Sequence, residues 1–234
     1  MELPKRLAAL AAFIPHGSIA ADIGTDHAYL PIFLVKQGIC RFVIATDLRE
    51  GPFQSAKHKI KEHTLEDRIS LRLGDGLQPL KPGEVEVLVL AGMGGNTIRG
   101  ILAGAPPTLA GIKRLVMQPM ADAGDLRNWL AANGWKIADE ELVEEDGRIY
   151  VVIAAEPGCE ATCDPLYLEL GPRLLEKKSP LLERHLNSFM VKYERVLAGL
   201  ALAHSTAARE KALEIEAKVD RIREVSACLQ KLVR

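Results

Sequence analysis

Two aspartates and a glycine lie close together where an apolar run of the sequence stops. Residues 19–23 are apolar except for Asp22, and Gly24, Asp26 and His27 follow within four positions. A strand that ends in an acidic-x-Gly turn and leads into a helix is how a parallel α/β sheet opens a pocket for a nucleotide-like ligand. The turn is a weak signal by itself, because an ordinary strand-turn-helix connection uses the same residue types.

The glycines that a dinucleotide-binding turn needs are missing. In the fingerprint G-x-G-x-x-G, the second and third glycines let the backbone approach a pyrophosphate. Here these positions carry Asp26 and either Tyr29 or Leu30, so a diphosphate would meet a carboxylate and a bulky side chain. S-adenosylmethionine has no phosphate, and its ammonium group is compatible with Asp22 and Asp26. The pattern therefore favours this ligand and makes a nicotinamide enzyme the least favoured alternative.

Two further acidic residues follow predicted strands. Asp47 ends the second apolar run, 23 residues after Gly24, at about the spacing where a carboxylate accepts hydrogen bonds from two ribose hydroxyls. The third run leads into Gly74, Asp75 and Gly76, where Asp75 can accept a hydrogen bond from an adenine amino group. Because the carboxyl ends of parallel strands meet at one edge of a sheet, we expect Asp22, Asp47 and Asp75 to converge.

The fourth and fifth predicted strands end in residues suited to an acceptor. The segment 91–96 holds three glycines in four positions, which places nearly bare backbone where a transferred group would lie. A planar acceptor could approach closely there, beside Met93 and Gly94. Gln118 ends the fifth strand and can both donate and accept a hydrogen bond. A tight strand-to-helix turn is the structural alternative for the glycines.

The order of predicted elements indicates an α/β fold. A first helix is expected over residues 7–14, and strands are expected over the seven runs 19–22, 42–47, 69–73, 86–90, 114–118, 136–143 and 149–155. Helical patterns between the first five runs favour a parallel sheet. The polar, glycine-containing segment 144–148 predicts a hairpin between the last two strands. Five parallel strands that close with such a hairpin are the strand inventory of a class I methyltransferase, a Rossmann-like seven-stranded sheet.

The pattern changes near residue 158. After Pro165 the apolar residues recur at alternating steps of four and three along residues 182–203 and again along 212–233. These two heptad stripes predict a C-terminal helical hairpin of coiled-coil type. We therefore expect two domains, residues 1–158 and residues 159–234. The hairpin could grip a substrate or form a weak homodimer, and the sequence leaves both open.

Composition sets limits on the function. The 234 residues are 48% hydrophobic with a net charge of −1, so charge alone does not indicate nucleic-acid binding. No apolar run approaches the roughly 18 residues of a membrane span, and the N-terminal residues lack a cleavage-site pattern. We expect a cytoplasmic protein without a membrane partner. Of the four cysteines only Cys159 and Cys163 lie close together, so no metal site is expected.

Several blocks together resemble one known family. These are residues 22–31 (DIGTDHAYLP), 51–52 (GP), 72–77 (RLGDGL), 91–95 (AGMGG), 118–119 (QP), and Leu126 and Arg127 with Trp129 and Leu130. In this order and spacing, across roughly residues 3–158, the chain resembles the bacterial tRNA (adenine-22-N1)-methyltransferases, the TrmK family. The resemblance implies transfer of the methyl group of S-adenosylmethionine to N1 of an adenine in the D-loop region of tRNA, with S-adenosylhomocysteine as product. It also implies that the hairpin is the family's C-terminal coiled-coil domain.

Site residues follow from the motifs and this resemblance. The expected cofactor-binding residues are Arg6, Asp22, Gly24, Asp26, His27, Asp47, Leu48, Gly74, Asp75, Gly76, Ala91, Gly92 and Met93. The expected catalytic residues, which would hold the base or meet its developing charge, are Asp26, His27, Tyr29, Met93, Gly94 and Gln118. The family pattern has Asn after Gln-Pro where this chain has Met120, so that position offers no amide to the base.

Two other classes of function remain as alternatives. One is a non-catalytic RNA-binding protein that keeps a methyltransferase fold, although the intact Asp22, Gly24, Asp47 and Asp75 argue against loss of the cofactor. The other is a methyltransferase acting on a small molecule or a protein, for which the sequence lacks an insertion that could enclose a small acceptor.

Overall fold

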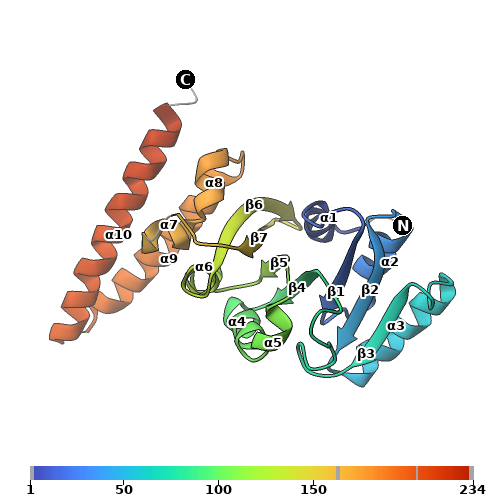
Figure 1. The fold of residues 1–234 in the computed structure, drawn as a ribbon. Helices are drawn as coiled ribbons and strands as arrows, with labels where there is room; N and C mark the ends of the chain where they lie inside the picture. The colour runs from blue at the N-terminus through green and yellow to red at the C-terminus, as the bar shows by residue number, and fades with distance from the viewer. Residues whose placement is uncertain (1–2, 162–163, 204, 232–234) are drawn as a thin grey trace. The chain divides into compact units, whose positions relative to one another are not determined.

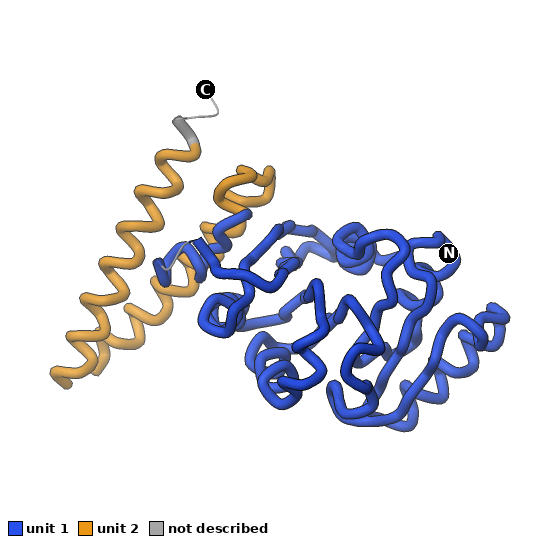
Figure 2. Tube along the Cα trace, viewed as in Figure 1, with its two compact units in different colours: residues 1–173 blue, residues 174–234 orange. Residues whose placement is uncertain are grey.

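The structure, a computed structural model, describes residues 3–161, 164–203 and 205–231. Cys163 of the expected cysteine pair lies outside the described residues. The chain divides into two compact units, residues 1–173 and residues 174–234, which Figure 2 shows in different colours. Unit 1 contains the whole sheet, and unit 2 consists of helices.

The sheet of unit 1 has seven strands in the order β3-β2-β1-β4-β5-β7-β6 (Figure 1). The strands are β1 (Ser18–Ile23), β2 (Cys40–Asp47), β3 (Ile69–Leu73), β4 (Val87–Met93), β5 (Arg114–Pro119), β6 (Trp135–Glu145) and β7 (Arg148–Pro157). β1 to β5 pair in parallel, and β7 pairs antiparallel with both β5 and β6. The α/β class, the seven strands and the closing hairpin are confirmed. The strand order reverses between β1 and β4, where a ligand site is expected in such a sheet.

Six helices of unit 1 connect or flank these strands. They are α1 (Lys5–Ala12), α2 (Tyr29–Lys36), α3 (Glu50–Glu62), α4 (Gly95–Ala103), α5 (Pro106–Leu109) and α6 (Ala123–Ala132). The inner strands carry apolar residues on both faces, and Ala20, Ala21, Val89 and Leu90 are fully buried. Such near-continuous apolar strands form only where helices cover both faces of a parallel sheet.

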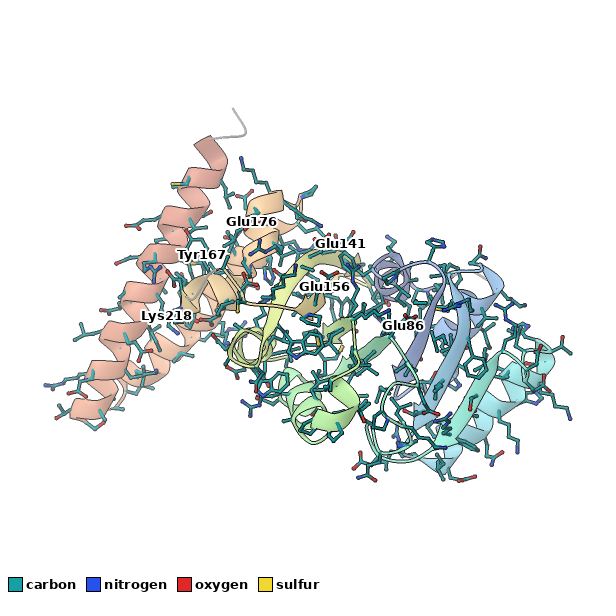
Figure 3. All side chains as sticks on the ribbon, in the orientation of Figure 1. Glu86, Glu141, Glu156, Tyr167, Glu176 and Lys218 are labelled. Atoms are coloured by element: carbon teal, nitrogen blue, oxygen red, sulfur yellow. The ribbon has the colours of Figure 1, made fainter. Side chains whose placement is uncertain are left out.

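Acidic side chains at the start of β4 and the end of β7 pair with basic side chains at the start of β5. Glu86, labelled in Figure 3, accepts hydrogen bonds from Lys113 Nζ at 2.6 Å and from the backbone N–H of Ile19 at 3.2 Å. The Lys113 ammonium lowers the pKa of Glu86. Glu156, also labelled there, pairs with Arg114, which lowers the pKa of Glu156 in the same way. These ion pairs link the start of β5 to the start of β4 and to the end of β7.

A buried ion pair attaches the segment after β7 to the sheet. Arg127 Nε lies 2.6 Å from Glu140 Oε1, and both side chains are completely buried. Arg127 Nη1 also donates to the carbonyls of Leu168 and Glu169, both in α7 (Pro165–Leu170). Glu140 Oε2 accepts the backbone N–H of Arg173 at 3.0 Å. These contacts tie residues 164–173 to unit 1, which ends at residue 173, and the domains 1–158 and 159–234 stay a prediction.

Unit 2 contains two long helices that pack against each other. After α8 (Pro172–Lys177), which crosses the boundary, come α9 (Leu182–Ala201) and α10 (Thr206–Lys231). Leu186, Tyr193, Ile215 and Val219 are buried, as the heptad stripes predict, whereas Val196 is 40% exposed. The helical hairpin is present, and its coiled-coil packing stays a prediction. None of the described helices is long and apolar enough to cross a membrane.

Candidate functional site

A cavity of about 500 Å³ lies at the carboxyl ends of β1, β2 and β4. Its walls come from α1, the turn between β1 and α2, the residues after β2 and the end of β4. The lining residues are Pro4, Arg6, Leu7, Asp22, Gly24, Thr25, Asp26, His27, Tyr29, Leu30, Asp47, Leu48, Arg49, Ala91, Gly92 and Met93. Ten of the thirteen residues expected to bind the cofactor are therefore brought together here.

Asp22 is a buried acidic group of the cavity. The residue is 5% exposed, as is Asp47, and the Thr25 hydroxyl donates to Asp22 Oδ2 at 2.7 Å. Burial raises the pKa of Asp22 to about 6, the Thr25 hydrogen bond opposes this, and the nearby Asp47 adds to the rise. Ionisation of this buried carboxyl costs free energy when no positive charge is nearby. A cationic group of a ligand would offset that cost, so Asp22 is suited to bind one.

Asp47 holds the turn between β1 and α2 in place. Its Oδ2 accepts the backbone N–H of Asp26 at 3.1 Å, and its Oδ1 accepts that of Arg49 at 2.9 Å. The neighbouring Thr46 carbonyl accepts the N–H groups of Gly24 and Thr25. Two carboxylate oxygens in fixed positions at the cavity wall can still accept hydrogen bonds from ligand hydroxyls, because each has more than one lone pair.

Gly24 is required in this turn for two reasons. Its φ of +75° lies in the left-handed region, which other residues adopt only with strain. A Cβ there would also come within 2.5 Å of Met93 Cε. Asp26 and Ala28 adopt φ values of +54° and +55°, so the turn alternates left-handed residues before α2 begins. Hydrogen bonds to β2 hold this unusual backbone.

Two rings stand at the mouth of the cavity. The His27 and Tyr29 ring centroids lie 5.6 Å apart at an interplanar angle of 55°. His27 Nδ1 is 2.6 Å from Ser55 Oγ, and Lys59 Nζ donates to Tyr29 Oη at 3.0 Å. His27 Nε2 lies 3.5 Å from Asp26 Oδ2, and both side chains remain largely exposed. The cavity thus combines carboxylates with an exposed aromatic pair.

Arg6 reaches the cavity from α1. Its Nε lies 3.2 Å from Glu145 Oε2 in β6, and the Arg6 side chain is 32% exposed. A guanidinium at the wall can pair with a ligand carboxylate. Leu48 is 62% exposed beside Asp47 and offers an apolar surface. Both residues lie where the sequence predicted them.

The third acidic strand end lies in a different hollow. Asp75 and Gly76 line a depression of about 300 Å³ together with residues of α4, including Thr97 and Ile101. Gly74 lines neither hollow, although its N–H donates to the Asp47 carbonyl at 2.9 Å. Asp75 thus does not line the cavity that Asp22 and Asp47 share, and its contact with the donor stays a prediction. The loop after β3 turns toward α4, since Gly74 and Gly76 both have positive φ.

Only some of the residues predicted to face the methyl acceptor line the cavity. Gly92 and Met93 line it, and Gly92 has a φ of +73° at a register shift between β4 and β5. Gly94 and Gln118 line neither hollow. Gln118 is completely buried, its Nε2 donates to the Pro119 carbonyl, and its Oε1 has no hydrogen-bond partner among the described residues. Gln118 is therefore closed off from the cavity in this structure, and its contact with the base stays a prediction.

Sequence reasoning missed four residues that shape the site. Thr25 and Arg49 line the cavity, and Ser55 and Lys59 contact the two rings from α3. Thr25 follows Gly24, so its position within the turn was a usable signal. Ser55 and Lys59 lie 28 and 30 residues from their partners, and no local pattern announces such contacts.

The fold and the cavity together define a class of proteins. A seven-stranded sheet with β7 inserted antiparallel between β5 and β6, and a cavity walled by acidic strand ends, is a class I S-adenosylmethionine-dependent methyltransferase fold. Within this class, residues 20–224 match the family described as TrmK, tRNA (adenine(22)-N(1))-methyltransferase. The chain belongs to that family.

Relatives agree across most of the chain. The tRNA (adenine(22)-N(1))-methyltransferase of Bacillus subtilis is 40% identical over 184 residues, which is 76% of this chain and 77% of the relative. The crystal structure of the B. subtilis m1A22 tRNA methyltransferase TrmK superposes with a TM-score of 0.90 at 33% identity, covering 96% of this chain and 99% of that one. A Streptococcus pneumoniae structure, described as a putative tRNA (m1A22) methyltransferase in complex with S-adenosyl-L-methionine, gives 0.82 at 34% identity, covering 96% and 100%.

Proposed function

We propose that this protein transfers the methyl group of S-adenosylmethionine to N1 of adenine 22 of tRNA. The observation that carries the proposal is the cavity in which Asp22 and Asp47 line the wall beside the Gly24 turn, in a chain that belongs to the TrmK family. The B. subtilis relative bears this activity in its name, and the S. pneumoniae structure contains the methyl donor.

The residues of the cavity fit the methyl donor. Asp47 presents two oxygens to the ribose diol, and Asp22 offers a buried carboxylate to the ammonium or sulfonium charge. Arg6 can pair with the carboxylate of the amino-acid end, while Leu48, Ala91 and Met93 supply apolar contacts. Gly24 leaves room that a Cβ would fill. Asp75 lines a separate hollow and remains the candidate acceptor for the adenine amino group.

The chemistry of N1 methylation makes modest demands on the protein. The adenine N1 lone pair lies in the ring plane and attacks the methyl carbon directly, so no base is needed before attack. The bound donor supplies an electrophilic methyl group, and as the new N–C bond forms and the C–S bond breaks, the positive charge passes to the purine. What the chain must supply is alignment of the two reactants and exclusion of water.

Residues at the cavity mouth suit these tasks. N1 takes part in base pairing, so the adenine must be turned out of its stack and held against apolar or aromatic surfaces. Tyr29 and His27 provide aromatic rings. Met93, with Gly92 and Gly94 on either side, provides a surface with little side-chain bulk. The Asp26 carboxylate lies beside His27 and can stabilise the charge that develops on the purine.

The setting of the enzyme follows from its substrate. An enzyme of tRNA works where tRNA matures, so we place it in the cytoplasm. The helices of unit 2 either contact tRNA or join two copies in a weak homodimer, and residues 1–158 carry the donor-binding elements. Sedimentation of the full chain with and without tRNA separates the two uses of unit 2.

The direct test uses two transcripts. The protein is incubated with methyl-labelled donor and either a tRNA with adenine 22 or the same tRNA with guanine 22, and nucleosides are analysed by mass spectrometry. We expect 1-methyladenosine from the first transcript alone. Calorimetry with S-adenosylmethionine should show binding, and Asp47→Ala should weaken it tenfold or more, on the order of 1.4 kcal/mol. Equal labelling of both transcripts would reject the site assignment, and no binding of the donor would favour a non-catalytic RNA-binding protein.

A further inference from the structure

One face of α3 holds both rings at the cavity mouth. Ser55 and Lys59 are four residues apart, which places them one above the other on the same side of a helix. Ser55 Oγ meets His27 Nδ1 at 2.6 Å, and Lys59 Nζ meets Tyr29 Oη at 3.0 Å. Lys59 Nζ also lies 4.2 Å from the centroid of the Tyr29 ring. Two successive turns of one helix therefore contact two ring side chains, one in the turn before α2 and one at the start of α2.

We propose that Ser55 and Lys59 are positioning residues that hold His27 and Tyr29 as a ready-made surface for the purine turned out of the tRNA. The inference rests on the proposed function and extends it to residues of α3 that do not line the cavity. Ser55 acts through His27, and Lys59 acts through Tyr29.

The backbone of the turn is fixed independently of α3. Asp26 N–H is bound by Asp47, and Gly24 and Thr25 N–H by the Thr46 carbonyl. The ring side chains themselves are partly solvent-exposed, the His27 side chain at 42% and Tyr29 at 37%. Exposed side chains change rotamers within nanoseconds unless their polar ends are held. The contacts from α3 reach those ends, and Lys59 Nζ also lies over the Tyr29 ring, so they restrict rings that remain partly exposed.

The Ser55 contact also orients the two nitrogens of the His27 ring. Nδ1 faces Ser55 Oγ at 2.6 Å, and Nε2 faces Asp26 Oδ2 at 3.5 Å. In the tautomer in which the Ser55 hydroxyl donates to Nδ1, the proton of the neutral ring is on Nε2. The ring then links Ser55 to Asp26, the carboxylate best placed to meet the charge on the methylated purine. Loss of the hydroxyl would release both the ring orientation and this link.

The Lys59 contact suits an RNA nucleotide in particular. Base stacking on an aromatic ring contributes about 1–3 kcal/mol, and an ammonium near the ring adds to it. Lys59 has three N–H donors, of which Tyr29 uses one. The remaining donors can bind the phosphate next to the extruded base, because phosphate contacts fix register without reading sequence.

The first test needs neither donor nor tRNA. Long-range proton–nitrogen spectra of the full-length protein report which imidazole nitrogen carries the proton. We expect Ser55→Ala to change the His27 signals and Ser55→Thr, which keeps the hydroxyl, to restore them. Unchanged His27 signals in Ser55→Ala would show that the contact does not hold the ring and would overturn the inference.

The second test is kinetic and uses a matched charge control. Lys59→Met and Lys57→Met remove the same charge from α3, but only Lys59 contacts Tyr29, and Lys57 is exposed. We expect Ser55→Ala and Lys59→Met each to lower kcat for tRNA methylation about tenfold. This is the effect of losing about half of the free energy of one base-stacking contact. The dissociation constant of S-adenosylmethionine should stay within twofold, and Lys57→Met should change kcat less than threefold.

A double-mutant cycle separates positioning from general damage. In a His27→Ala background, Ser55→Ala should have no further effect on kcat if it acts through His27. Additive losses, or equal losses for Lys59→Met and Lys57→Met, would overturn the inference while wild-type methylation of adenine 22 leaves the proposed function standing. A wild-type protein that forms no 1-methyladenosine would instead reject the proposed function itself.

Discussion

Burial raises the pKa of the Asp22 carboxyl to about 6, above its unfolded value of 3.8, and this links folding and ligand binding to pH. The protonated form is favoured in the folded protein, so Asp22 costs little stability below about pH 4. Between about pH 4 and pH 6 the unfolded chain ionises this carboxyl while the folded protein keeps it protonated, so stability falls with rising pH. Above about pH 6 the buried charge has its full cost of about 3 kcal/mol. The cationic donor offsets that cost when it binds, because it favours the charged form.

Asp22→Asn should therefore raise the stability of the free protein and weaken its binding of the donor. We expect the variant to be more stable than wild type at pH 7.5 in denaturant unfolding without ligand, with the difference vanishing near pH 4, because an amide keeps the shape and carries no charge. We expect wild-type affinity for S-adenosylmethionine to fall as pH drops through about 6, and the variant to bind weakly with little change over that range. A variant that binds the donor as tightly as wild type at pH 7.5 would contradict this role.

Two adjacent glycines at the end of β4 should behave differently. Gly94 has a φ of −64° and only Thr97 Oγ1, at 3.8 Å, near a Cβ, so Gly94→Val should fold and bind the donor. Its side chain would occupy the acceptor surface and abolish turnover. A Cβ at Gly95 would lie 2.4 Å from the Asp122 carbonyl, so Gly95→Ala should lower stability by about 1–3 kcal/mol. Full activity of Gly94→Val in the tRNA methylation assay would remove the proposed acceptor surface.

At the residue scale, the sequence predicts the cavity residues that lie within a strand or directly after one. Asp22, Gly24 and Asp47 lie within or just after strands, and all three line the cavity. Asp75 was predicted by the same argument, but the path of a loop after a strand depends on its own φ angles and not on the strand pattern. Ser55 reaches His27 through the packing of α3, which no spacing along the chain encodes.

At the scale of elements, hydrophobic patterning predicts the strands well and their ends less well. β3 occupies the predicted residues, since polar residues bound it on both sides. β4 continues three residues beyond the predicted end, through Gly92 to Met93, because pairing with β5 resumes after the register shift. Helix α7 and its attachment to the sheet were not predicted. Arg127 was visible only as part of a motif, and its partner Glu140 lies in an alternating strand pattern where it could equally have faced solvent.

The buried Arg127–Glu140 pair should be a major source of stability for the segment 164–173. Arg127→Met would leave the Glu140 carboxylate buried without the guanidinium and the Leu168 and Glu169 carbonyls without its donors. Breaking such a pair costs about 3–5 kcal/mol, which denaturant unfolding would measure. The double variant Arg127→Met with Glu140→Gln should recover part of the loss. A loss below about 1 kcal/mol in the single variant would contradict the buried geometry.

At the scale of the whole molecule, the candidate site belongs entirely to unit 1. The cavity and the buried Arg127 network use residues up to 173, and all residues that line the cavity among those described belong to unit 1. A chain shortened to residues 1–173 should therefore bind S-adenosylmethionine within about threefold of the full chain. We expect its KM for tRNA to rise at least tenfold, on the order of 1.4 kcal/mol, if unit 2 contacts the RNA. An unchanged KM, together with loss of a dimer in sedimentation, would assign unit 2 to self-association instead.

The double duty of Asp47 affects how its contribution should be measured. The same two oxygens that face the cavity also tether the N–H groups of Asp26 and Arg49. Removal of this carboxylate frees the two tethered N–H groups and also removes a contact with the ligand. The affinity of such a variant therefore reflects both losses at once. Donor analogues that lack the 2′- or 3′-hydroxyl change only the small molecule and leave the tether intact. Such synthetic analogues, compared across one unaltered enzyme, would measure the sugar recognition by itself.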